Sequence, residues 1–235
     1  MITVGGLLPF TTIDFPGKLS AVIFMQGCPL RCPYCHNPEL QVPSAKTNVS
    51  WDEVLNLLKQ RQKLLDGVVF SGGEPLLQTG LKQAIQCVRD LGYAVALHTS
   101  GAYPERLKEV LPLVDWIGLD IKSAFNKYAV ASGTADGFEM GRKAQIALDM
   151  ILDFGTAFEV RTTTDPRVVN KEDILSLAKV LSAKGVKTFA LQEYRPLNDG
   201  KLPEPSVTEI KSFYTDKDFE TTLKKMFPEF IMRRA

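Results

Sequence analysis

Short apolar runs alternate along the chain with longer stretches in which apolar residues recur every three or four positions. Runs that are apolar throughout are typical of strands buried on both faces of a parallel sheet. We therefore predict six strands, at Ala21–Met25, Gly67–Phe70, Ala94–Leu97, Trp116–Ile121, Ala157–Thr163 and Lys187–Leu191.

The stretches between these runs have helical spacing and carry the signals that begin and end helices. Ser50 followed by Glu53 forms a capping box, and Gly92 is a typical helix stop. These patterns predict a helical segment after residue 205 and helices at Trp51–Leu65, Leu81–Leu91, Glu105–Leu111, Gly141–Leu152 and Lys171–Leu181.

This regular alternation of strands and helices favours an α/β fold. Strands separated by helices pair in parallel through right-handed crossovers. The periodicity alone does not say whether such a sheet is an open barrel or flat. We predict one domain over residues 1–235, with a core at about 18–195 and a C-terminal extension at about 196–235. Residues 196–205 alone have the composition of a loop.

Composition narrows the class of protein. The 235 residues are 45% hydrophobic, enough for one substantial core, and the formal net charge is +1. A nucleic-acid-binding domain is usually clearly basic, so no nucleic-acid partner is expected. The N-terminus lacks the pattern of a signal peptide, and no apolar stretch is long enough to span a membrane. We therefore expect a cytoplasmic protein without a membrane partner.

Three of the four cysteines crowd into one short segment, in the order Cys28, Cys32, Cys35. A reducing cytosol does not maintain disulfides, so clustered thiols indicate a metal. Structural zinc takes four ligands, and His36 adjoins Cys35 too closely for easy tetrahedral closure. Three thiolates can instead hold three irons of a cubane cluster and leave the fourth open. A zinc site or three unrelated buried thiols remain alternatives. Cys87, alone on an apolar helix, is predicted to be buried.

Polar residues follow several predicted strands, where the carboxyl ends of parallel strands converge. Each group also has a purely structural interpretation. The Gly-Gly-Glu-Pro segment could form a turn, Thr-Ser could begin a helix, Asp and Lys could form a structural bridge, and the arginine could form a core salt bridge. The candidates are Gly72, Gly73, Glu74, Pro75, Thr99, Ser100, Asp120, Lys122 and Arg161.

The cysteine spacing, with aromatic Tyr34 before the last cysteine and a strand before the first, resembles the cluster loop of the radical S-adenosylmethionine superfamily. Two segments together, Ile13–Gly17 (IDFPG) and Gln26–Leu40, resemble the activating enzymes of glycyl-radical enzymes. Among these, the chain looks most like the activating protein of anaerobic ribonucleoside-triphosphate reductase. The segment around Asp14 is similar to the family's Val-Asp-Gly-Pro-Gly, with Phe15 in place of the usual glycine.

The resemblance implies a partial (β/α)6 barrel of the radical S-adenosylmethionine type. It implies a 4Fe-4S cluster on the three cysteines, whose open iron chelates S-adenosylmethionine. A reduced cluster then cleaves that molecule to methionine and a 5′-deoxyadenosyl radical, which makes a glycyl radical on a partner enzyme. It also implies a reductant such as flavodoxin or ferredoxin.

The same resemblance assigns roles to the polar candidates. Lys122 is expected to meet the substrate carboxylate and to be catalytic together with Asp14, which lies near the target peptide. The alternative for Asp14 is that it simply caps a turn. The residues expected to contact S-adenosylmethionine are Tyr34, His36, Gly72, Gly73, Glu74, Pro75, Thr99, Ser100, Asp120, Lys122 and Arg161.

Two other functions are kept open. One is a radical enzyme that acts on a small molecule, such as a 7-carboxy-7-deazaguanine synthase, which would have a closed pocket and need no protein partner. The other is a non-catalytic iron–sulfur or zinc protein. That function would explain the cysteines but neither the Gly-Gly-Glu-Pro segment nor the polar strand ends.

Overall fold

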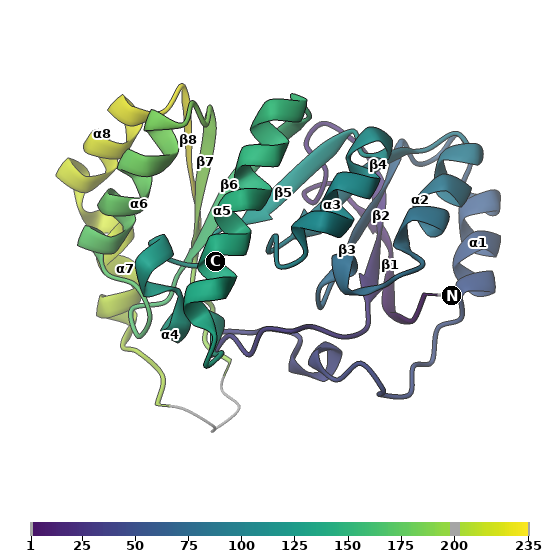
Figure 1. Cartoon of the computed structure of the whole chain (residues 1–235), viewed down its shortest axis with the longest axis horizontal. Coiled ribbons are helices and arrows are strands. Elements are labelled where there is room, and N and C mark those ends of the chain that lie inside the picture. The colour runs from purple at the N-terminus through teal and green to yellow at the C-terminus, as the bar shows by residue number, and fades with distance from the viewer. Residues whose placement is uncertain (1, 198–202, 235) are drawn as a thin grey trace. The chain divides into compact units, whose positions relative to one another are not determined.

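A computed structural model describes residues 2–197 and 203–234, so residues 198–202 of the predicted loop lie outside the described residues. Figure 1 labels the elements along the chain. Eight strands form one open sheet in chain order, β1 to β8. The α/β class is thus confirmed. The strands are β1 (Val4–Thr11), β2 (Ser20–Met25), β3 (Gly67–Gly72), β4 (Ala94–Thr99), β5 (Trp116–Asp120), β6 (Ala157–Thr164), β7 (Thr188–Glu193) and β8 (Glu229–Arg233).

The sheet is largely parallel. Parallel pairs of neighbouring strands include β2 with β3, β3 with β4, β6 with β7, and β7 with β8. Strand β1 is the exception, since it runs antiparallel to β2. Its sequence VGGLLPFT contains two glycines and a proline, which weaken a strand pattern and are typical of an edge. This composition explains why the sequence pattern did not predict β1.

The chain divides into two compact units. The first comprises residues 1–29, 37–118 and 146–158, and the second comprises residues 30–36, 119–145 and 159–235. The cysteine segment is therefore shared, with Cys28 in the first unit and the other two cysteines in the second. Strand β5 and helix α5 (Gly137–Phe154) also cross the division.

In the first unit, apolar side chains of β2, β3 and β4 pack together with Phe15. The cluster contains Phe15, Val22, Val69 and Ala96, with Trp116 partly buried against it. Helix α2 lies beside β4 and beside α3 (Figure 1). The helical elements here are η1 (Pro38–Gln41), α1 (Trp51–Gln60), η2 (Pro75–Leu77), α2 (Leu81–Asp90), α3 (Pro104–Val110) and η3 (Leu111–Leu113).

In the second unit, α6 and α8 lie side by side next to the last strands (Figure 1). A fork-shaped ion pair joins Glu159 on β6 to Arg233 on β8, at 2.6 and 2.7 Å. The helical elements of this unit are η4 (Phe125–Lys127), α4 (Tyr128–Ser132), α6 (Lys171–Ala183), α7 (Val207–Thr215) and α8 (Lys217–Met226).

The predicted strands and helices exist, with shifted ends. Helix α1 ends at Gln60 rather than Leu65, because the chain turns there and Lys63 takes a left-handed φ of 69°. Its capping box at Ser50 and Glu53 is present as predicted. Helix α5 begins earlier than predicted, at Gly137. In the part of the chain that the structure describes, no helix is both long and apolar enough to cross a membrane.

Candidate functional site

The beginning of the cysteine segment is fixed directly after β2. Gly27 has a φ of 96°, which favours glycine, and its backbone N–H donates to the carbonyl of Leu40 at 2.7 Å. The N–H of Cys28 donates to the carbonyl of Gln41 at 3.2 Å. These bonds hold the Cys28 backbone at the carboxyl end of a buried strand.

The rest of the segment is fixed inside the second unit. The Arg31 N–H donates to the Ser132 carbonyl at the end of α4, at 2.8 Å. Gly133 follows with a φ of 62°, and a Cβ there would lie 1.9 Å from the Arg31 carbonyl oxygen. A tight turn, closed by the Cys35 N–H on the Cys32 carbonyl at 3.1 Å, then places these two cysteines close together along the backbone.

None of the four cysteines forms a disulfide. Cys28, Cys32 and Cys35 are partly exposed, so the alternative of three fully buried thiols does not describe them. Burial still raises the pKa of the Cys32 thiol, although the positive charge of Lys122 opposes that rise. Cys87 is exposed on α2, so its predicted burial was wrong. It falls on the outer side of a helix whose inner side carries Ala84, Ile85 and Val88.

The donor set fits an iron–sulfur cluster, since three soft thiols, none of them in a disulfide, lie on one loop directly after a strand. Within the described residues, no three His, Cys, Asp or Glu side chains are grouped so as to hold a single metal ion. His36 is exposed, and partial burial of its ring together with Arg195 lowers the pKa of its imidazole.

The two glycines of the Gly-Gly-Glu-Pro segment are required by close packing. A Cβ on Gly72, which has a φ of 111°, would lie 2.3 Å from the Met25 nitrogen, and one on Gly73 would lie 2.2 Å from the Gly27 carbonyl oxygen. The Glu74 N–H donates to that same oxygen at 2.8 Å. The segment is thus pinned against the beginning of the cysteine loop, and buried Pro75 then begins η2.

The Glu74 carboxylate lies inside the protein and is held there by donors of its own unit. Its Oε1 accepts from the Thr99 hydroxyl at 2.6 Å and from the Leu76 N–H at 3.1 Å. Its Oε2 accepts twice from Ser100. Burial raises the pKa of this carboxyl although the four donors oppose the rise. The structure therefore joins the predicted residues Glu74, Thr99 and Ser100 into one internal network.

Asp14 occupies a turn. Its Oδ2 accepts from the Thr11 hydroxyl at 2.6 Å, and its carbonyl oxygen lies 2.8 Å from His98 Nε2. Because a carbonyl only accepts, His98 donates through Nε2 in this contact. Phe15 points into the core instead, with 3% of its surface exposed and its ring 6.1 Å from that of Trp116.

Asp120, Lys122 and Arg161 come together in the second unit. The Lys122 ammonium donates to Asp120 Oδ2 at 3.0 Å, and Arg161 Nε donates to Asp120 Oδ1 at 2.7 Å. Burial acts to lower the pKa of Lys122, but Asp120 and the neighbouring Tyr34 and Cys32 raise it well above its ordinary range. The amine is therefore a cation, suited to an anionic ligand group. The salt bridges that the sequence left as alternatives are present.

A second polar network, which the sequence pattern did not predict, forms after β6 and β7. Arg167 donates to both oxygens of buried Asp165, and its guanidinium lies 4.8 Å from the centre of the Tyr194 ring. The Tyr194 hydroxyl donates to Glu204 at 2.5 Å. The rule of polar residues past strand ends would have found Asp165 and Arg167, because they directly follow β6.

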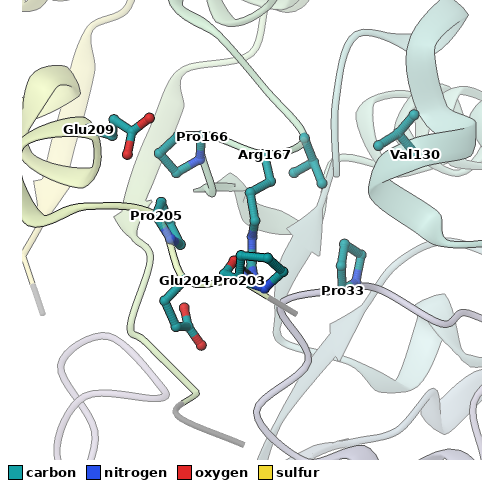
Figure 2. Close-up of a pocket in the computed structure, with 9 residues that line it drawn as sticks. Pro33, Val130, Pro166, Arg167, Pro203, Glu204, Pro205 and Glu209 are labelled. Atoms are coloured by element: carbon teal, nitrogen blue, oxygen red, sulfur yellow. Dashed lines mark hydrogen bonds between the residues drawn. The ribbon is translucent and has the colours of Figure 1, made fainter. Parts of the chain in front are cut away.

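A pocket of about 570 Å³ lies beside this network, as Figure 2 shows. The Arg167 guanidinium donates to the Pro203 carbonyl at its edge, at 3.1 Å. The pocket adjoins the cysteine segment through Pro33. It is lined by Pro33, Val130, Pro166, Arg167, Val168, Pro203, Glu204, Pro205 and Glu209.

Comparisons of the chain with a family model and with curated proteins indicate the same family. The model of the radical SAM superfamily matches residues 22–143. A protein of Methanocaldococcus jannaschii, named provisionally as a glycyl-radical enzyme activating enzyme, is 33% identical over 88% of this chain and 88% of its own. The pyruvate formate-lyase-activating enzyme of Clostridium pasteurianum is 31% identical over 93% of this chain and 94% of its own.

A solved structure supports the fold. The crystal structure of Streptococcus suis SuiB bound to S-adenosylmethionine matches with a TM-score of 0.67 and 11% identity, over 89% of this chain. The chain spans 48% of that protein, so the likeness concerns the fold alone. Radical SAM enzymes use a 4Fe-4S cluster and S-adenosylmethionine. From the matched family model and the two curated relatives, the chain belongs to the radical SAM superfamily, among the activating enzymes of glycyl-radical enzymes.

Proposed function

We propose that this protein generates a glycyl radical on an anaerobic ribonucleoside-triphosphate reductase. The observation that carries the proposal is the loop of three cysteines after β2, in a chain at least 31% identical to activating enzymes over most of its length. The choice of the reductase rests on the resemblance of Ile13–Gly17 and Gln26–Leu40 to its activating protein.

In this proposal, Cys28, Cys32 and Cys35 hold the cluster. When bound, the cluster and S-adenosylmethionine supply an organic radical that can abstract a hydrogen atom from a carbon. The protein's own part is to bind, orient and exclude water. The loop carrying Gly72, Gly73 and Pro75 presents backbone to the methionine end of S-adenosylmethionine, because the glycines leave no side chains in the way.

The polar residues then divide into two roles. The Glu74 carboxylate already accepts hydrogen bonds from Thr99, Ser100 and Leu76, so it shapes the loop from behind, while Thr99 and Ser100 line the ligand. Lys122 and Arg161, held by Asp120, bind anionic groups, with Lys122 at a carboxylate. Tyr34 and His36 contact the ligand from the cysteine segment, and Asp14 holds its turn near the target peptide.

The proposal also includes the cellular setting. A flavodoxin or ferredoxin supplies the electron, because reductive cleavage consumes one electron per S-adenosylmethionine. We place the protein in the cytoplasm, where free thiols stay reduced.

A radical enzyme for a small molecule is the second candidate. The pocket beside Pro33, at about 570 Å³, lies in the size range of small-molecule sites. Two of its charged lining residues are engaged with the protein, since Arg167 binds Asp165 and Glu204 binds Tyr194. This engagement favours the activase.

The test is to incubate the reduced, cluster-loaded protein and S-adenosylmethionine anaerobically with the candidate reductase from the same organism. We expect a glycyl radical doublet in the electron paramagnetic resonance spectrum of the reductase. The signal should vanish when the target glycine is replaced by alanine. Cleavage of S-adenosylmethionine with no radical on any glycyl-radical enzyme, but with turnover of a pterin, would establish the second candidate instead.

A further inference from the structure

The hydroxyl of Tyr34 is an exception among the buried tyrosines. Tyr34 has 5% of its surface exposed, and its side chain packs with Tyr194 and Ile210, with Cys32 against them. Its hydroxyl has no hydrogen-bond partner among the described residues. Each of the other buried tyrosines has one, namely Tyr93, Tyr128, Tyr194 and Tyr214.

An unpaired buried hydroxyl costs folding free energy, so a protein keeps one only where something compensates. Phenylalanine would fill the same space without that cost. The ring of Tyr34 is already well packed, so the packing explains the ring and leaves the hydroxyl unexplained. The hydroxyl is thus a donor prepared for an acceptor that the polypeptide does not supply.

The surroundings indicate the charge of that acceptor. Tyr34 lies between two of the cluster cysteines in sequence and within electrostatic reach of Lys122 and Cys32. A lysine ammonium has three N–H donors, and Asp120 takes one of them. Ser123, next to Lys122 in sequence, is fully buried, and its hydroxyl is also without a partner among the described residues. Donors and positive charge in one buried region suit an anion.

We propose that the Tyr34 hydroxyl donates a hydrogen bond to an anionic acceptor of the bound cofactors, beside Lys122. The acceptor is either a sulfur of the cluster or the carboxylate of S-adenosylmethionine. The inference rests on the proposed cofactor site. It adds a role for the Tyr34 hydroxyl, which that proposal does not require.

The first arm of the test needs no cofactor. Urea unfolding of the cofactor-free Tyr34→Phe protein should show stability equal to or above that of the wild type, because the variant removes an unpaired hydroxyl. Tyr128→Phe and Tyr194→Phe are matched controls, and both should lose stability because their hydroxyls are bonded. A Tyr34→Phe loss as large as theirs would mean that the hydroxyl is already satisfied, by water for example, and would overturn the inference.

The second arm uses the reconstituted protein and separates the two acceptors. A shifted midpoint potential of the Tyr34→Phe cluster without S-adenosylmethionine would assign the acceptor to the cluster. An unchanged potential with about tenfold weaker binding of S-adenosylmethionine would assign it to the carboxylate, since one hydrogen bond contributes about that factor. No change in either quantity would overturn the inference. A wild-type protein that assembles no cluster would instead refute the proposed function.

Discussion

Ser100 donates two hydrogen bonds to one oxygen of Glu74, from its backbone nitrogen at 2.8 Å and from its hydroxyl at 2.5 Å. Glu74 follows β3 and Ser100 follows β4, so the pair joins the ends of two neighbouring strands. A loop expected to touch a ligand is thereby fixed by a carboxylate that faces the protein interior.

Glu74→Ala should destabilise the cofactor-free protein by about 3 kcal/mol. The substitution removes hydrogen bonds to a charged group and leaves the buried Thr99 and Ser100 donors unpaired. Urea unfolding under reducing conditions measures the loss. Glu105→Gln, an exposed position on α3, is the control and should change stability little. A stable Glu74→Ala protein that merely binds S-adenosylmethionine poorly would show that Glu74 acts as a ligand instead.

Glu74 should also give the protein a distinctive pH dependence. Burial raises its pKa in the folded chain, so the folded state binds this proton more tightly than the unfolded state. Its contribution to the free energy of unfolding therefore falls as the pH rises from about 4.3, the ordinary value for Glu, to the raised pKa. The free energy of unfolding of the wild type minus that of Glu74→Gln should fall as the pH rises over that interval. If this difference instead grows with pH, the four hydrogen-bond donors outweigh burial in setting the pKa.

Replacing Cys28, Cys32 or Cys35 by alanine should each abolish assembly of the cluster, because no spare thiol adjoins them in sequence. Iron and sulfide content after anaerobic reconstitution measure this. Cys87→Ala is the control, since Cys87 is exposed on α2, and it should keep the full cluster. Air should bleach the wild-type absorbance and release iron. A colourless, air-stable protein that holds stoichiometric zinc would contradict the cluster.

The sequence predicted the strands well because apolar runs such as Ala21–Met25 are buried on both faces. It failed at the edges, where β1 and β8 are half-exposed and lose that pattern. In the site, the sequence indicated a bridge between Asp120 and Lys122 and a salt bridge for Arg161. It did not show that Asp120 is the partner of both, because an ion pair between two strands depends on their register. The inward-facing role of Glu74 could not be predicted either, since its donors follow a different strand.

Lys122→Met should weaken binding of S-adenosylmethionine by about ten- to a hundredfold, the effect of one charged hydrogen bond. Stability of the cofactor-free protein should change less, because Asp120 keeps its bond to Arg161. Arg161→Met should behave alike, since Lys122 then remains with Asp120. Titration calorimetry measures the affinity for S-adenosylmethionine, and urea unfolding measures the stability of the cofactor-free protein.

The matched control for these variants is Lys127→Met. Lys127 also forms an ion pair, with Asp173 at 2.6 Å, but its side chain is 57% exposed, so neither quantity should change much. Unchanged affinity with a large loss of stability in Lys122→Met and Arg161→Met would show that the three charged residues serve the fold alone.

Substitutions of Phe15 test whether this residue serves the fold or contacts a partner. The segment Ile13–Gly17 resembles a family segment with glycine at the position of Phe15, and an outward-facing ring at that position would narrow the approach of a peptide. The ring instead lies in the core, so close to Gly67 that a Cβ there would approach it to 2.9 Å. Phe15→Ala should therefore cost about 3–5 kcal/mol in urea unfolding, and Phe15→Leu clearly less. Radical formation on the partner by folded Phe15→Leu protein should match that of the wild type. A variant of normal stability with altered yield on the partner would place Phe15 at the interface.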